Sequence, residues 1–150
     1  MCCSMSSKKI TFKNNKGQTL VARLELPENE QPKVFALFAH CFTCNKNLTA
    51  VRTIGKTLTK KSIAVLRFDF TGLGESEGDF EHTNFSSNVE DLYSAAQFLS
   101  ENYQAPSLLI GHSLGGAAVL FASAKIPSVK AIATIGAPSN PEHVSHLFKK

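Results

Sequence analysis

One serine of the sequence has neighbours arranged as in a nucleophilic enzyme site. Ser113 stands at the centre of Gly111-His112-Ser113-Leu114-Gly115, after an apolar run typical of a strand and before small residues typical of a helix. A Gly-x-Ser-x-Gly turn between strand and helix is a nucleophile elbow, which projects the hydroxyl above the sheet. The glycines leave room where a Cβ would collide, and the helix start favours negative charge. We therefore predict that Ser113 is a nucleophile; an incidental serine in a tight turn is the alternative.

A second candidate segment is His40-Cys-Phe-Thr-Cys-Asn-Lys46, directly after the apolar run Val34–Ala39. Acyl transfer needs two backbone N–H donors that point at the developing oxyanion. One normally belongs to the residue after the nucleophile, here Leu114, and the other to the loop after an early strand. We predict that the backbone N–H of Phe42 is the second donor, with that of Cys41 as the next candidate. A plain connecting loop is the alternative.

The third segment runs from Arg67 to Gly78 and contains Gly72 and Gly74 at the spacing of a dinucleotide-binding loop. The third glycine of that pattern would fall on Glu77, so a nucleotide site is excluded. We expect Asp69 to fix this loop at the carboxyl edge of the sheet rather than to act as the catalytic acid. No cofactor and no metal ion are expected.

A competing chemistry is thiol redox. Cys41 and Cys44 form a Cys-x-x-Cys between a strand and a helix, which is also the arrangement of thioredoxin. That reading leaves the serine turn and the N-terminal hairpin unexplained. The N-terminus lacks a secretory signal, so we expect a cytoplasmic protein whose four cysteines are free thiols.

The elements that must position these residues follow from the hydrophobic pattern. Alternating apolar residues predict an antiparallel hairpin with one buried side, and unalternating apolar runs predict strands buried on both faces of a parallel sheet. Helical stripes fall between those runs, as crossover connections require. The predicted hairpin strands are Ile10–Asn14 and Gln18–Leu26; the parallel strands are Val34–Ala39, Ile63–Phe68, Ser107–Ile110 and Ala131–Ile135; the helices are Asn47–Lys61, Asn84–Asn102 and Leu114–Lys125. The pattern predicts a doubly wound, mostly parallel α/β sheet.

Composition narrows the class of ligand. The chain has 150 residues, 43% of them hydrophobic, which is ordinary for one globular domain. Its net charge of +4 comes from scattered lysines rather than a basic cluster, so no nucleic-acid partner is expected. No apolar run approaches the roughly 20 residues that cross a bilayer, so no membrane partner is expected either. A small molecule is the expected ligand.

Three segments together carry a family resemblance: Phe68-Asp-Phe-Thr-Gly-Leu-Gly-Glu-Ser76, Gly111-His-Ser-Leu-Gly-Gly116 and the His40 loop. They resemble the α/β-hydrolase superfamily, in the branch of serine-aminopeptidase-like and acyl-ester hydrolases. The resemblance implies a sheet of that type and a serine esterase that cleaves a small acyl ester or amide through an acyl-enzyme on Ser113. His40 and Asp69 would support the site. A non-catalytic binding module that keeps the hydrolase core is an alternative function.

A narrower resemblance suggests a second domain fused to the hydrolase domain. The His40 loop and residues 84–91 resemble the hydrolase half of bacterial proteins in which such a domain is fused to an OsmC-like domain. Two positions depart from the wider family, since Cys41 and Thr71 stand where relatives often carry glycine and arginine. These departures concern specificity more than fold.

The end of the chain lacks two parts of the expected catalytic triad. The family order is serine, acid, histidine, but only Glu142, His143 and His146 follow Ser113 as candidates, and they come too early for these roles. We therefore expect residues 1–150 to be the N-terminal portion of a single α/β-hydrolase domain. The later strands, catalytic acid and histidine would lie beyond Lys150, and the isolated fragment would be inactive.

Overall fold

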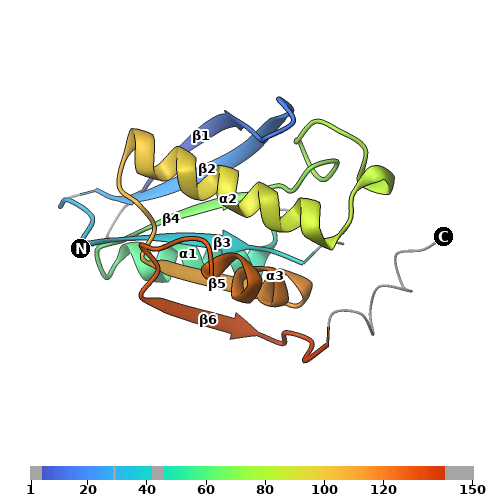
Figure 1. Cartoon of the computed structure of the whole chain (residues 1–150). Helices are drawn as coiled ribbons and strands as arrows, with labels where there is room; N and C mark the ends of the chain where they lie inside the picture. The colour runs from blue at the N-terminus through green and yellow to red at the C-terminus, as the bar shows by residue number, and fades with distance from the viewer. Residues whose placement is uncertain (1–4, 29, 42–45, 141–150) are drawn as a thin grey trace.

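A mostly parallel sheet forms the centre of the computed structural model, which describes residues 5–28, 30–41 and 46–140 (Figure 1). Its strands are β1 (Met5–Lys13), β2 (Thr19–Pro27), β3 (Val34–Ala39), β4 (Ile63–Phe68), β5 (Leu108–His112) and β6 (Ala131–Ile135). They lie in the order β1-β2-β4-β3-β5-β6. The pairs β1/β2 and β2/β4 are antiparallel and the other neighbours are parallel. The predicted hairpin and parallel sheet are confirmed.

Helices cover both faces of this sheet, as the apolar strands require (Figure 1). The helices are α1 (Thr49–Thr59), α2 (Phe85–Asn102) and α3 (Leu114–Ser123), with a short 3-10 helix η1 at Phe80–His82. Helices α2 and α3 pack with the sheet in the larger hydrophobic cluster, whereas α1 packs in a second cluster on the other face. The three predicted helices are confirmed. In the described part of the chain, no helix is long and apolar enough to cross a membrane.

Strand β2 differs from the one-sided strand that its alternating residues predict. Leu20, Ala22 and Leu24 are buried as expected, but Val21 and Glu25 on the opposite face are buried too. The reason is tertiary: β2 pairs with both β1 and β4, and α1 contacts it. A carboxylate therefore lies inside the molecule, where it needs a partner.

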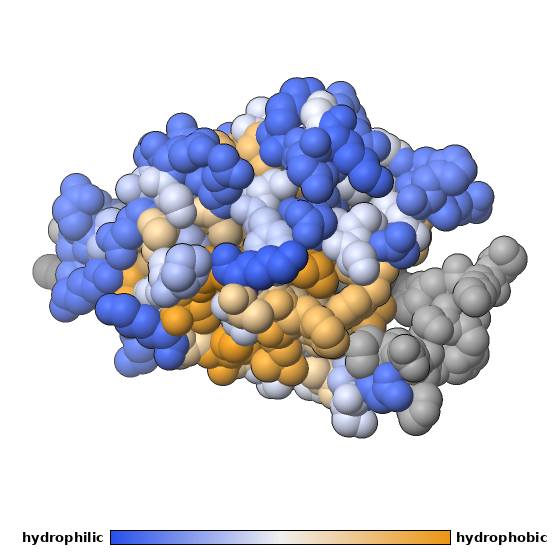
Figure 2. Space-filling view, viewed as in Figure 1, coloured by the Kyte–Doolittle hydropathy of each residue, from blue (hydrophilic) through white to orange (hydrophobic). Residues whose placement is uncertain are grey.

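Strand β6 differs in the opposite sense. Its sequence predicts a strand buried on both faces, but all five of its residues are exposed. In the described structure, β6 is an edge strand that pairs only with β5. Leu120 and Phe121 of α3 are 49% and 59% exposed, and Ile132 and Ile135 are 37% and 42% exposed. Figure 2 shows hydrophobic residues gathered over α3 and β6 on the lower half of this face.

The exposed edge leads to a prediction for the 150-residue chain. We expect it to self-associate, because unpaired N–H and C=O groups beside apolar side chains are a template for another strand. Ile132→Lys should weaken the association, since a charge on an edge opposes pairing. Sedimentation velocity over a hundredfold concentration range measures it. Leu48→Lys, the same type of change at an exposed site outside β6, is the control. A concentration-independent monomer would contradict the prediction.

Candidate active site

Ser113 lies in the tight turn between β5 and α3. Its φ of 55° and ψ of −126° are outside the ordinary regions for a residue with a side chain. Its backbone N–H donates to Ile135 O of β6 at 2.8 Å, which holds the turn against the neighbouring strand. Such a conformation persists only where the surroundings impose it, and it is concentrated at functional sites. The strained turn that the sequence predicts is confirmed; the role of the hydroxyl stays a prediction.

The two glycines of the turn are required by close backbone contacts. A Cβ on Gly111 would lie 2.4 Å from Gly115 O, and a Cβ on Gly115 would lie 2.4 Å from His40 O and 2.5 Å from Ala39 O. Real Cβ atoms essentially never come this close to another heavy atom. The second contact also shows that the serine turn packs directly on the end of β3. The serine turn therefore lies against the start of the His40 loop. The sequence predicts that these two segments act together in acyl transfer.

The predicted oxyanion donors can be placed in part. Leu114 is the first residue of α3, so no carbonyl of its own helix can accept its backbone N–H. Cys41 is 7% exposed and takes part in a disulfide bond. The expectation that all four cysteines are free thiols is therefore wrong for Cys41. That expectation was based on the redox compartment alone, whereas a disulfide also depends on which sulfur atoms the fold brings close together. Phe42 and Cys44 lie outside the described residues.

His40 is buried at the junction between β3 and the following loop. Its Nδ1 lies 2.6 Å from Cys41 O, and a carbonyl can only accept, so Nδ1 carries the proton. The ring packs edge-on against Phe70, with the centroids 5.4 Å apart. Its Nε2 lies 3.5 Å from Oδ1 of Asp69. His112, just before Ser113, has a buried Nδ1 without a hydrogen-bond partner among the described residues.

Asp69 is completely buried and collects contacts from both loops of the site. Its Oδ1 accepts the backbone N–H of Lys46 at 2.7 Å, and its Oδ2 accepts that of Glu75 at 3.1 Å. The Lys46 ammonium pairs with Oδ2. Burial by itself raises the pKa of Asp69, but the contacts with His40 and Lys46 outweigh burial and hold this pKa far below its ordinary value. Asp69 is thus ionised at neutral pH and joins two loops, which supports the fixing role expected for it.

Sequence reasoning missed four charged residues around Asp69: Lys46, Glu75, Glu25 and Arg67. The Lys46 side chain is 1% exposed and its Nζ contacts Glu75 Oε2 at 2.7 Å. Arg67 pairs with Glu25 Oε1 at 2.8 Å and donates from Nη1 to Lys46 O. The available signal was a charge inside an apolar strand, since Glu25 follows Leu24 in the hairpin and Arg67 interrupts Ile63–Phe68. Buried charges require partners, and these partners define the network.

Glu75 provides a prediction about pH. The hydrogen bond from Lys46, followed by that from Lys9, lowers the pKa of Glu75 from 4.5 to about 2. A depressed folded-state pKa gives stability that is complete above the unfolded value of 4.5 and is lost as the pH falls toward 2. The difference in unfolding free energy between wild type and Glu75→Gln should therefore shrink from pH 5 to pH 3. Urea denaturation at a series of pH values measures it.

The control for this experiment is Glu101→Gln. Glu101 accepts from the neutral amide of Gln97 rather than from an ammonium group. A difference for Glu75→Gln that is the same at pH 7 and pH 3 would contradict the assigned ion pair.

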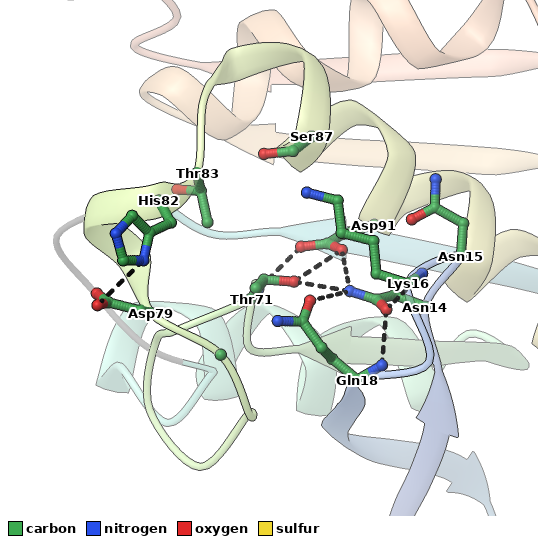
Figure 3. A pocket seen from close by; sticks show the side chains of 11 residues that line it. Asn14, Asn15, Lys16, Gln18, Thr71, Asp79, His82, Thr83, Ser87 and Asp91 are labelled. Carbon is green, nitrogen blue, oxygen red and sulfur yellow. Dashed lines mark hydrogen bonds and ion pairs between the residues drawn. The ribbon is translucent and has the colours of Figure 1, made fainter.

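A polar pocket of about 340 Å³ lies beside the Asp69 loop (Figure 3). Its buried carboxylate, Asp91 of α2, accepts from Thr71 N at 2.8 Å, Thr71 Oγ1 at 3.0 Å and Asn14 Nδ2 at 3.3 Å. Burial raises the pKa of Asp91, and these hydrogen bonds offset part of the rise. In the described residues no hydrogen bond or ion pair links Asp91 to Ser113. Asp91 therefore ties the β1–β2 turn to α2 and to the loop after β4.

A mostly parallel sheet, helices on both faces and a strained serine turn between strand and helix define the α/β-hydrolase class. The sequence model of one family in this class, described as serine aminopeptidase, S33, matches residues 31–149. The chain belongs to this family. The structure thus confirms the fold class that the resemblance implies. Glu142, His143 and His146 lie outside the described residues.

Known proteins similar to the chain agree with this assignment. The crystal structure of an esterase domain from Rhodothermus marinus is 58% identical, with a TM-score of 0.78, over 94% of this chain and 54% of that one. A monoglyceride lipase of Rattus norvegicus is 28% identical over 89% of this chain and 45% of its own length. A mitochondrial palmitoyl-protein thioesterase of Bos taurus is 30% identical over 67% of this chain and 31% of its own length. The chain spans about half or less of each relative.

Proposed function

We propose that this chain carries the nucleophile of an α/β-hydrolase that cleaves a small acyl ester through an acyl-enzyme on Ser113. The observation that carries the proposal is the backbone of Ser113 at the end of β5, where a φ of 55° is combined with a ψ of −126°. This combination of angles lies outside the left-handed region as well as the ordinary regions, and strain of this kind is concentrated at functional sites. The thiol-redox alternative gives no reason for the conformation, and neither does a binding module without a nucleophile.

The chemistry follows from the positions of the groups. Ser113 Oγ attacks the acyl carbonyl while a general base takes its proton, and the carbonyl oxygen becomes an oxyanion. The N–H of Leu114 and a donor from the His40 loop stabilise that oxyanion. The protonated base then gives its proton to the leaving alcohol, and water releases the acyl group from Ser113. We assign the base and its acid partner to the part of the domain beyond Lys150.

The names of the relatives narrow the substrate class. An esterase domain, a monoglyceride lipase and a palmitoyl-protein thioesterase all refer to an acyl group joined to oxygen or sulfur rather than nitrogen. An alkoxide or thiolate leaves a tetrahedral intermediate more readily than an amine does. We therefore favour an ester or thioester over an amide as the substrate of the full-length enzyme.

Labelling with a fluorophosphonate tests the proposal. The reagent phosphonylates a serine only where a base and an oxyanion site activate it. We expect stoichiometric labelling of the Ser113 peptide in the full-length enzyme, loss of the label in Ser113→Ala and retention in Ser123→Ala. Peptide mass spectrometry identifies the modified residue. An unlabelled wild type, or a label that persists in Ser113→Ala, would refute the assignment.

A further inference from the structure

Asp69 connects the buried Lys46 to the backbone beside the serine turn. The connection starts at the Lys46 ammonium, which pairs with Asp69 Oδ2. The His40 ring lies against the same carboxylate: its Nε2 is 3.5 Å from Asp69 Oδ1 and makes no hydrogen bond among the described residues. His40 Nδ1 then donates to Cys41 O at 2.6 Å. Each of these side chains is almost completely buried, so water does not compete for the contacts. Lys46, Asp69 and His40 therefore form one buried row of neighbouring side chains that ends at the backbone of Cys41.

Lys46 is held at more points than a charge pair requires. Its backbone N–H donates to Asp69 Oδ1, its Nζ also contacts Glu75, and its carbonyl accepts from Arg67 Nη1. Arg67 is in turn paired with Glu25 inside the sheet. Burying an ammonium group is costly, and only such complete pairing offsets that cost. The lysine is therefore fixed relative to both β2 and β4.

The far end of this connection reaches the nucleophile turn. A Cβ on Gly115 would lie within 2.5 Å of the carbonyl oxygens of Ala39 and His40, so α3 begins directly against the segment that Asp69 holds. Hydrogen-bond donors for an oxyanion must be placed to within a fraction of an ångström, because a shift of about 1 Å can cost roughly a hundredfold in rate. Fixing this segment would therefore matter for catalysis as well as for stability.

We propose that Lys46 is a positioning residue of the hydrolase site, which acts through Asp69 and His40 on the backbone of Cys41. This inference rests on the proposed function. A positioning role differs from that of an ordinary structural ion pair. Loss of a structural pair lowers the fraction of protein that is folded, whereas loss of a positioning residue lowers the turnover of each folded site.

The experiment compares Lys46→Met with Lys9→Met in the full-length enzyme. Both changes remove an ammonium group that pairs with Glu75. The side chain of Lys9 is half exposed, however, and among the described residues it has no ion pair with Asp69, whereas Lys46 does. We measure kcat and KM on a p-nitrophenyl ester, with active sites counted by fluorophosphonate titration. For Lys46→Met, kcat per titrated site should fall roughly 10- to 100-fold with little change in KM. Lys9→Met should keep the wild-type kcat.

A second variant guards against a folding failure. Lys46→Met leaves the buried Asp69 carboxylate without its ammonium, whereas Lys46→Met with Asp69→Asn leaves no unpaired charge. Replacement of a buried ion pair by uncharged groups is often neutral for stability. The double variant should fold and still show the reduced kcat per titrated site. Wild-type kcat in either folded variant would overturn the positioning role while the proposed function stands. A wild type that takes no label would refute both.

Discussion

Replacement of Ser113 by alanine should lower esterase kcat in the full-length enzyme by roughly four or more powers of ten. In the proposed mechanism the change removes the atom that forms the acyl-enzyme, and the oxyanion donors alone supply a small part of the rate. The fold should be intact, because the hydroxyl contributes little packing and alanine can follow the same strained turn as serine. Steady-state hydrolysis of a p-nitrophenyl ester measures the loss, and circular dichroism checks the fold.

Ser123→Ala is the matched control for this prediction. Ser123 ends α3, and its hydroxyl donates only to Leu120 O at the exposed side of the helix. Its kcat should equal that of wild type. Normal turnover in Ser113→Ala would mean that another group attacks the carbonyl and that the strained serine serves only the fold.

Gly115→Ala should have the largest effect on stability, a loss of about 3 kcal/mol or more. In a helix without neighbours the same change would stabilise by about 1 kcal/mol, because alanine has the higher helix propensity. Here the added methyl would meet the backbone oxygens of Ala39 and His40 at 2.5 and 2.4 Å. Backbone atoms of a central strand cannot move aside as a flexible side chain can. The clash therefore outweighs the gain in helix propensity, and the variant is less stable than wild type. Urea denaturation measures the free energy of unfolding.

Gly17→Ala is the informative comparison. Gly17 has a φ of +77°, yet nothing lies within 4 Å of its added Cβ, so only the backbone conformation penalises alanine. That penalty should be about 1 to 2 kcal/mol. If Gly115→Ala cost less than Gly17→Ala, the contact between the serine turn and the end of β3 would be looser than the structure shows.

The order and type of the elements could be predicted from the sequence because each depends on local spacing. The unalternating run Val34–Ala39 is strand β3 with the same bounds, and Ala131–Ile135 is strand β6 with the same bounds. The serine turn was predictable for the same reason, since the glycines at 111 and 115 and the flanking strand and helix are adjacent in the chain. Burial was less predictable, because β6 has the composition of a central strand but lies at an edge of the described sheet.

The sequence by itself determined the α/β class, the strained turn at Ser113 and the loop expected to face it, because these follow from short-range pattern and from glycines in a fixed spacing. Only the tertiary structure decided that β2 is an inner strand, that Cys41 is in a disulfide and that Lys46 pairs with Asp69. Lys46 and Asp69 are 23 residues apart in sequence and belong to loops after two different strands. They meet because parallel pairing of β3 with β4 brings the carboxyl ends of both strands to one edge, and burial there makes the pair obligatory.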